Sequence, residues 1–418
     1  MTPGHEAQGE TTDGRRAALI AWCLYDWANS AFPTVVITFI FGVYYTSTLA
    51  ETPEAGAWQW GVALGLSGLG VALFAPILGA LADQGGRRKP WLGAFTVLAV
   101  VCAAALWWVE PDPAFALLAL VVIGLGNACF EFGQVFYNAM LPEIADKARL
   151  GRVSGWAWGL GYAGGLACLA LCLVLFVRET GPVLALDTEA FEQVRITGPF
   201  VALWFALFAL PLFLLTPDSP ARKVAAGQAI RQGLTTLLAT LRALPRQGQI
   251  GRFLLARMIY TDGLNTLFIF GAIFAREIFD MSFQEILMFG ILLNVAAGLG
   301  AAGFGWMDDR LGAKPTIVTA LFGLMLFGAL LLLVTSKAWF IAVGCMLGLF
   351  VGPAQAASRS LMARLAPAQV RTELFGLYAL SGKATAWIGP PLAGGVTLWA
   401  DSHRAGMATI LAFFLVGL

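Results

Sequence analysis

Four ionisable side chains lie inside long apolar stretches of the chain, where a charge is costly. They are Asp26, Glu131, Asp262 and Lys383. A charge at the centre of a lipid bilayer costs about 2.5–3.5 kcal/mol even on lenient insertion scales. Each of the four lies about ten residues from an end of its stretch, which is ~15 Å at the rise of a helix. We therefore expect all four near mid-depth in a membrane, where acids can carry protons and a deep lysine can bind a carboxylate.

Amide side chains accompany these charges at helical spacing. Asn29 and Asn265 follow the two aspartates by three residues, so each pair shares a helix face. A polar stripe at positions i, i+4, i+7 and i+11 is formed by Asn127, Glu131, Gln134 and Asn138. Such a stripe should face water or substrate rather than lipid. The predicted substrate and proton pathway comprises Asp26, Asn29, Asn127, Glu131, Gln134, Asp262, Asn265 and Lys383.

Structural roles are alternatives for the same residues. Asp26 and Asp262 could hydrogen-bond to backbone or asparagine groups and fix helix packing. Glu131 and Lys383 could form an ion pair between the two halves of the chain. Otherwise Glu131 could load a proton on one side of the membrane and release it on the other. Arg257 is only ~7.5 Å deep, so it is predicted to extend to the cytosolic surface.

The composition indicates what positions these groups. Hydrophobic residues make up 59% of the chain and charged residues 12%, against roughly a quarter charged in soluble domains. A bilayer can solvate that much apolar surface, so the chain is predicted to be an all-α polytopic membrane protein. Twelve spans are predicted, at residues 17–45, 58–82, 90–109, 114–141, 153–177, 198–216, 252–277, 283–306, 314–335, 338–360, 373–399 and from 405 onward. The last stretch is short, which suggests that the sequence ends inside its twelfth helix.

The placement of Lys and Arg sets the expected orientation. Most of them, including Arg359 at the end of the tenth predicted span, fall in segments on the side of the N-terminus, which is therefore predicted to be cytosolic. The predicted organisation is a cytosolic tail (1–16), a six-helix bundle (17–216), a cytosolic linker with an amphipathic helix (217–251) and a second six-helix bundle (252–418). The net charge of +1 argues against a nucleic-acid partner.

The two bundles are related by an internal repeat. A loop motif recurs at an offset of 226 residues, and it matches Gly79, Asp83 and Gly86 to Gly305, Asp309 and Gly312. A second match pairs Asp26 with Asp262, and a third, at an offset of 221, pairs Gly155 with Gly376. The predicted gating residues are Gly79, Asp83, Gly86, Arg87, Arg88, Gly305, Asp309 and Gly312. A carboxylate at the cytosolic edge can hold a helix N-terminus across the interface in one state and release it in another.

The loop motif, Gly79-Ala-Leu-Ala-Asp-Gln-Gly-Gly-Arg-Arg88, resembles the cytoplasmic signature of the major facilitator superfamily, apart from Gln84. The segments that begin at Tyr25, Ala256 and Gly376 resemble the bacterial branch of the vacuole effluxer-like family, which includes the yeast permease that exports amino acids from the vacuole. This resemblance implies the superfamily fold, two six-helix bundles about a pseudo-two-fold axis. It also implies a central cavity lined by spans one, four, seven and ten.

These features favour a secondary transporter that moves a small solute by alternating access, with protons as the driving ion. A mixture of acids and one deep lysine suits a zwitterion, so amino-acid or related metabolite efflux is the expected activity. The alternative is a membrane receptor or assembly factor that keeps the fold and transports nothing. No enzyme activity, cofactor or metal is predicted. The expected setting is a monomer among the lipids of a bacterial inner membrane.

Overall fold

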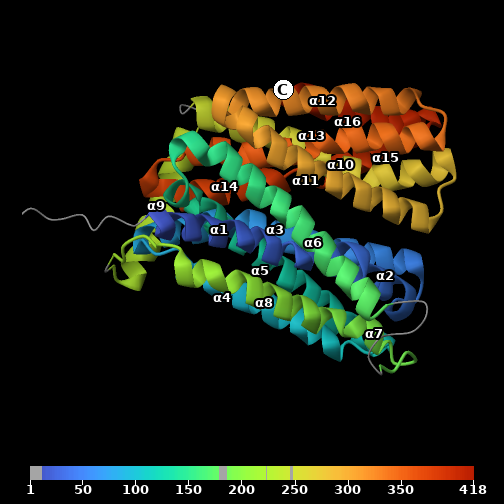
Figure 1. Cartoon of the computed structure of the whole chain (residues 1–418), viewed down its shortest axis with the longest axis horizontal. Coiled ribbons are helices and arrows are strands. Elements are labelled where there is room, and N and C mark those ends of the chain that lie inside the picture. The colour runs from blue at the N-terminus through green and yellow to red at the C-terminus, as the bar shows by residue number, and fades with distance from the viewer. Residues whose placement is uncertain (1–11, 178–185, 223, 245–247) are drawn as a thin grey trace, which may run out of the picture.

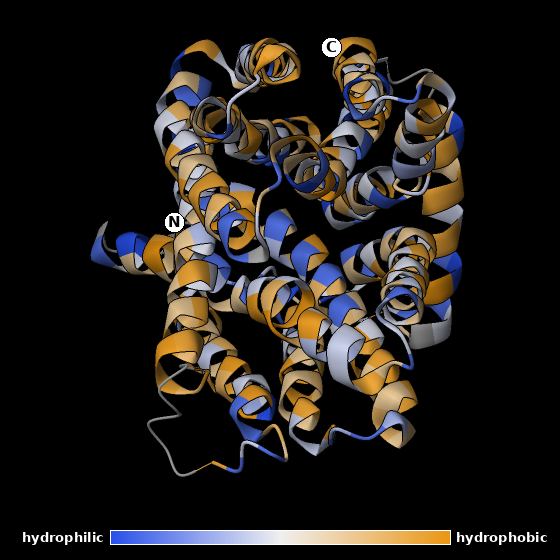
Figure 2. Cartoon of the chain, turned by 90° about the vertical axis from the view of Figure 1, so that its right-hand side faces the viewer, coloured by the Kyte–Doolittle hydropathy of each residue, from blue (hydrophilic) through white to orange (hydrophobic). Residues whose placement is uncertain are grey.

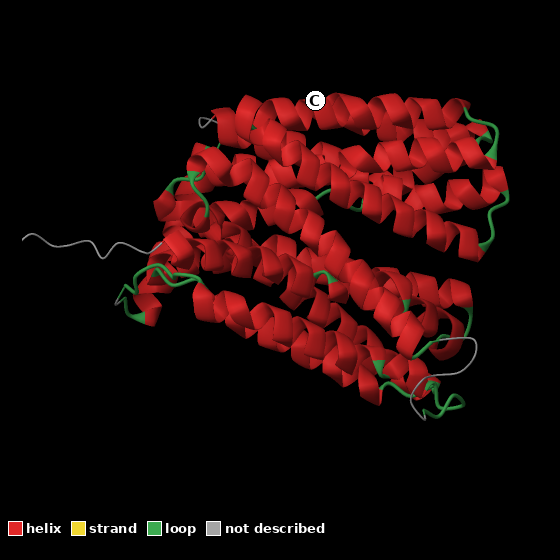
Figure 3. Ribbon diagram, in the orientation of Figure 1, coloured by secondary structure: helices red, strands yellow, loops and turns green. Residues whose placement is uncertain are grey.

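The structure, a computed structural model, describes residues 12–177, 186–222, 224–244 and 248–418. These residues form helices joined by short loops, and Figure 3 shows no strand among them. Most of the predicted cytosolic tail, residues 1–11, lies outside the described part, and the first helix begins at Thr12 rather than at residue 17. Helix α10 likewise begins at Gly248, four residues before the predicted start of the second bundle.

Two bundles lie side by side, with the N-terminal one in blue to green and the C-terminal one in yellow to red (Figure 1). The N-terminal bundle contains α1 (Thr12–Asn29), α2 (Phe41–Tyr44), α3 (Pro53–Gly85), α4 (Lys89–Ala105), α5 (Ala116–Ile144), α6 (Leu150–Leu175), α7 (Glu192–Arg195) and α8 (Thr197–Leu215). Helix α9 (Ala226–Ala243) lies in the linker. The C-terminal bundle contains α10 (Gly248–Phe279), α11 (Phe283–Leu311), α12 (Ala313–Leu333), α13 (Lys337–Leu365), α14 (Arg371–Lys383), α15 (Gly389–Ala400) and α16 (His403–Gly417).

Ten helical segments of the described chain are long and apolar enough to cross a membrane. The first of them joins α1 and α2 through π-helical turns at Phe32–Phe39. The other two predicted spans are accounted for by the short helix α16 and by a span broken into α14 and α15. Hydrophobic residues predominate around the periphery in Figure 2, and hydrophilic ones gather where the bundles meet and at the helix ends.

The break in the eleventh span has a local cause. Helix α15 begins at Gly389, and Pro390 and Pro391 follow in its first turn. A proline has no backbone N–H to donate and disfavours helical geometry in the residue before it. The helix therefore stops at Lys383, and α15 begins six residues later. Irregular backbone at membrane depth is tolerated where it is buried in protein or lines a cavity.

Contacts between the bundles follow the repeat seen in the sequence. A Cβ added to Gly376 of α14 would lie 2.5 Å from the carbonyl oxygen of Ala75 in α3. One added to Gly155 of α6 would lie 2.3 Å from the carbonyl oxygen of Ala301 in α11. Only glycine allows backbones to approach this closely. The pairs α3–α14 and α6–α11 are thus equivalent contacts on either side of a pseudo-two-fold axis.

Candidate functional site

An ion pair joins the two bundles at the break in the eleventh span. Lys383, the last residue of α14, lies with its Nζ 2.7 Å from Oε1 of Glu131 in α5. The side chains are 31% and 22% exposed. Of the two interpretations of these residues from sequence, the structure contains the ion pair. Ending α14 at this depth is what places the lysine opposite the polar stripe of α5.

Helix α10 holds the break on its α14 side through Arg257. Its guanidinium donates to the carbonyl oxygen of Tyr378 (2.5 Å) and to Oγ of Ser381 (2.8 Å). It also lies 3.5 Å from the centroid of the Tyr378 ring. A cation is stabilised at the C-terminal end of a helix. The prediction that Arg257 extends to the cytosolic surface is therefore wrong, because the broken span offers it acceptors inside the protein.

Asp262 holds the α15 side of the same break. Its Oδ1 accepts from the backbone N–H of Gly389 (3.3 Å), and a carboxylate is favoured at a helix N-terminus. The side chain is buried, and Oδ2 has no hydrogen-bond partner among the described residues. Asn265 lies half-buried one turn further along α10. Asp262 thus stabilises the backbone geometry that presents Lys383.

Asp26, the repeat equivalent of Asp262, contacts a different partner. Its Oδ2 lies 2.9 Å from Nη1 of Arg359 in α13, so it forms a second ion pair between the bundles. Asn29 is buried beside it on α1. Although sequence placed Arg359 at the cytosolic surface, its side chain is 0% exposed. The prediction failed because α13 continues to Leu365 and the N-terminal bundle covers this part of it.

Arg359 has a complete set of partners in the N-terminal bundle. Its guanidinium donates to the Oγ (2.9 Å) and the carbonyl oxygen (2.7 Å) of Ser154 and to Oδ1 of Asn138 (3.3 Å). Its Cζ lies 5.1 Å from the ring centroid of Trp22 and 4.8 Å from that of Trp158. A buried guanidinium needs such partners because its desolvation is costly. The arrangement ties the two bundles together on the cytosolic side of the Lys383–Glu131 pair.

The polar stripe of α5 is divided between these two ion pairs. Asn138 belongs to the Arg359 cluster, while Asn127 donates to Oγ of Ser67 in α3 (2.9 Å). Glu131 lies between them, and Gln134 is half-buried on the same face. The stripe faces the other bundle and its own neighbour α3, as expected for a face turned away from lipid.

The first predicted gate is a contact between a carboxylate of α3 and the N-terminus of α14. Asp83 accepts from the backbone N–H (3.2 Å) and Oγ1 (2.6 Å) of Thr372 and from the backbone N–H of Glu373 (2.9 Å). A Cβ on Gly79 would lie 2.4 Å from the carbonyl oxygen of Thr372, so glycine is required there. Gly86 ends α3 with φ of +82°, a conformation that favours glycine.

Arg88 extends this gate. It donates to Oγ1 of Thr372 (2.8 Å) and pairs with Glu143 of α5, while Arg371 of α14 approaches the same Glu143 (3.3 Å). Arg88 is buried, whereas Arg87, also predicted to gate, is exposed. Charges from both bundles therefore converge on one glutamate.

The second gate repeats the first with the bundles exchanged. Asp309 of α11 accepts from the backbone N–H of Gly151 (2.8 Å) at the start of α6 and pairs with Arg152 (2.5 Å). A Cβ on Gly305 would lie 2.9 Å from the Cα atom of Arg152, and Gly312 has φ of +97°. Both predicted gates lie at the same end of the molecule, the end that the Lys and Arg distribution predicts to be cytosolic.

Replacing Asp83 by asparagine is expected to weaken the first gate and to leave the Lys383–Glu131 pair unchanged. The amide loses the charge that favours a helix N-terminus, a contribution of about 0.3–1 kcal/mol for surface sites and up to ~2 kcal/mol when partly buried. Turnover should change while substrate affinity shifts less than a few-fold. Initial rates and equilibrium binding on the same preparation measure the two effects. Lost binding with an unchanged conformational equilibrium would show that Asp83 does not gate.

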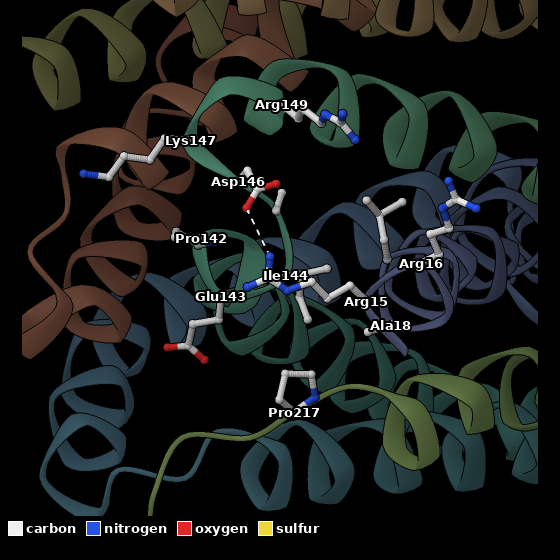
Figure 4. Close-up of a pocket in the computed structure, with 12 residues that line it drawn as sticks. Arg15, Arg16, Ala18, Pro142, Glu143, Ile144, Asp146, Lys147, Arg149 and Pro217 are labelled. Carbon is white, nitrogen blue, oxygen red and sulfur yellow. Dashed lines mark ion pairs between the residues drawn. The ribbon is translucent and has the colours of Figure 1, made fainter. Parts of the chain in front are cut away.

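A cavity of about 600 Å³ lies beside the first gate, within the N-terminal bundle (Figure 4). The start of α1 and the segment from α5 to α6 line it, and Arg15 reaches Asp146 across it at 3.9 Å. Glu143 lines it as well. The cavity is thus distinct from the Lys383–Glu131 pair and shares one residue with the gate.

Sequence reasoning missed three residues of this machinery. Arg359 was assigned to the surface, Arg257 was given no partner, and Glu373 was not considered. For Glu373 a signal existed, because it follows Arg152 by the 221-residue offset of the repeat. For the two arginines, the signal would have been the three acids and single lysine predicted at mid-depth, because buried acids need cationic partners.

Comparisons with known proteins place this geometry in a family. The family model described as "Vacuole effluxer Atg22 like" matches residues 144–418, and that of the major facilitator superfamily matches residues 10–169. The chain is 25% identical over 403 residues to an uncharacterised MFS-type transporter, YxiO, of Bacillus subtilis, covering 95% of this chain and 92% of that protein. It is 24% identical over 369 residues to autophagy-related protein 22 of Pichia angusta, covering 75% of this chain and 65% of that protein.

The fold has solved counterparts. The human organic anion transporter MFSD10 matches with a TM-score of 0.75 at 15% identity, over 96% of this chain and 98% of that one. Two bundles, ten long apolar segments and the fold match describe a multi-pass integral membrane protein. The chain belongs to the vacuole effluxer Atg22-like family and has the fold of the major facilitator superfamily.

Proposed function

We propose that the protein is a secondary active transporter that exports an amino acid or a related zwitterion by alternating access, driven by protons. The observation that carries the proposal is the Lys383–Glu131 pair, which is partly exposed and joins the two bundles at a helix break. A zwitterion can replace both halves of such a pair, because its ammonium group can bind Glu131 and its carboxylate can bind Lys383. A substrate that replaces the pair breaks the direct ion pair between Glu131 of the N-terminal bundle and Lys383 of the C-terminal bundle, which removes one contact between the bundles.

The remaining charges support movement of the bundles. The Asp83 and Asp309 gates and the Asp26–Arg359 pair all link one bundle to the other at the cytosolic side. Discrete contacts of this kind can break together when rigid bundles rock about a central site. The family description, an effluxer, favours export. A bacterial plasma membrane fits the Bacillus relative.

Counterflow in liposomes tests the proposal. Purified protein is reconstituted with a high internal concentration of unlabelled amino acids, and uptake of a labelled amino acid is followed. We expect transient accumulation of the labelled compound, since exchange needs no gradient of protons. A receptor or assembly factor on the same fold would bind without accumulation. A panel of amino acids, sugars and organic anions then defines the substrate class, and accumulation of sugars alone would contradict the zwitterion assignment.

A further inference from the structure

The two gates differ at one pair of equivalent positions. In the second gate, Arg152 pairs with Asp309 at 2.5 Å. Glu373 occupies the place of Arg152 in the first gate, 221 residues later in the repeat, and its backbone N–H donates to Asp83. At this position the second gate therefore has a cation and the first has a second carboxyl group, while the cation that pairs with Asp83 is Arg88 of its own bundle (3.6 Å).

The Glu373 side chain forms no ion pair among the described residues, although the Thr240 side chain of α9 lies close enough to favour its anion. It is 1% exposed, and neither carboxyl oxygen has a hydrogen-bond partner among the described residues. An ionised carboxylate that is buried and unpaired is strongly disfavoured. A neighbouring carboxylate disfavours it further.

The charged groups around Glu373 do not neutralise it. Asp83 of α3 is the charged group that acts on it. Arg88 pairs with Glu143 of α5 and also lies 3.6 Å from Oδ1 of Asp83, so its charge favours the ionised form of Asp83, and Arg371 pairs with Glu143. From the other helices packed against α14, Arg257 of α10 binds the backbone at Tyr378 and Arg364 of α13 pairs with Asp308. The three donors on Asp83 satisfy its ionised form, so a proton shared by the two acids belongs on Glu373.

We propose that Glu373 is a proton-binding site of the cytosolic gate, protonated while the gate is closed as it is here and deprotonated once the gate opens. Opening separates α14 from α3 and exposes the carboxyl group to cytosolic water, which accepts the proton and solvates the anion. Closing the gate requires Glu373 to take up a proton again and to lose its contact with water. Low pH therefore favours the closed gate, and rising pH favours the open one. The inference rests on the proposed alternating access, because it needs a gate that opens.

Distances between spin labels across the cytosolic side test this site without any substrate. Lys147→Cys and Gln369→Cys are exposed and lie at nearly equivalent places in the two bundles. The partly exposed Cys345 is replaced by serine, and the other five cysteines are buried. For one linked proton, the ratio of open to closed molecules should rise by up to about tenfold per pH unit. Between about pH 5 and pH 9 the wild type should shift toward the longer distance.

Two variants and a control distinguish the outcomes. Glu373→Gln keeps the shape but binds no proton, so it should stay closed across the range. Glu373→Arg, which copies Arg152, should do the same by pairing with Asp83. Glu277→Gln, an exposed acid of α10, should follow the wild type. The proposal is overturned if Glu373→Gln keeps the wild-type pH response or if the wild type shows none. Failure of counterflow with an intact pH response would reject transport and leave the proton site standing.

Discussion

Replacing Arg359 by leucine is expected to lower the free energy of unfolding by about 3–5 kcal/mol, the usual effect of removing one partner from a buried ion pair. The side chain is fully buried, and its loss leaves the Asp26 carboxylate desolvated with no cation. Ser154 and Asn138 lose their donor as well. Because the pair joins the two bundles, the variant should also populate the cytosol-open form. Thermal melting in detergent measures the first effect, and the distance between spin labels at Lys147→Cys and Gln369→Cys measures the second.

The control separates the charge from the packing. Arg310→Leu removes an exposed arginine on the same side of the molecule and should change stability by less than about 0.5 kcal/mol. Asp26→Leu combined with Arg359→Leu removes both charges, so much of the lost stability should return. A single variant as stable as the wild type would show that the pair contributes nothing. A double variant no better than the single would assign the effect to the other partners of Arg359, which are Ser154, Asn138 and the aromatic rings of Trp22 and Trp158.

Replacing Glu131 by glutamine is expected to abolish proton-driven accumulation while counterflow persists within a few-fold. Glutamine keeps the shape and can still accept a hydrogen bond from Lys383, but it cannot bind and release a proton. In the proposed mechanism, Glu131 binds the coupling proton and thereby releases Lys383, which lies 2.7 Å away. The measurement is uptake of labelled substrate into liposomes under an imposed pH difference, with counterflow on the same preparation.

Two further variants sharpen this test. Asn127→Asp tests whether any acid on the stripe supports coupling, because Asn127 lies one turn from Glu131. Lys383→Gln leaves Glu131 unpaired and should weaken zwitterion binding by about tenfold or more, since a partner for the substrate carboxylate is lost. Undiminished proton-driven accumulation in Glu131→Gln would exclude Glu131 from coupling. Asp26 and Asp262 would then be the remaining acids of the predicted pathway.

The sequence predicted the gates more fully than the charge pairs. An offset of 226 residues relates Asp83 to Asp309, and equivalent residues make equivalent contacts whenever the bundles are symmetric. Counting residues along helices also placed Glu131 and Lys383 at one depth. It could not show that they meet, because that depends on how α5 and α14 are rotated about their axes. Such rotations are set by packing between segments far apart in the chain.

The two arginines show where local reasoning fails. Arg359 stands near the end of an apolar stretch, so the positive-inside rule assigned it to the cytosol. Its burial comes from Trp22, Ser154 and Trp158, more than 200 residues earlier. Arg257 finds its acceptors, the carbonyl oxygen of Tyr378 and Oγ of Ser381, in the last turns of α14. In both cases the deciding partner lies in another helix and has no signature near the arginine.

Helix α14 is a rigid link between the Asp83 contact at the cytosolic gate and the Lys383–Glu131 pair. Its first turn receives the Asp83 carboxylate at the cytosolic gate, and its last residue, Lys383, carries the charge that meets Glu131. Its 13 residues span ~20 Å, and a helix this short is too stiff to absorb an axial displacement. Because α14 moves as one rigid body, a displacement of Lys383 along the helix axis is expected to displace Thr372 as well. A displacement of Thr372 at the gate is likewise expected to move Lys383. The break after Lys383 allows α14 to move independently of α15, the other half of the same span.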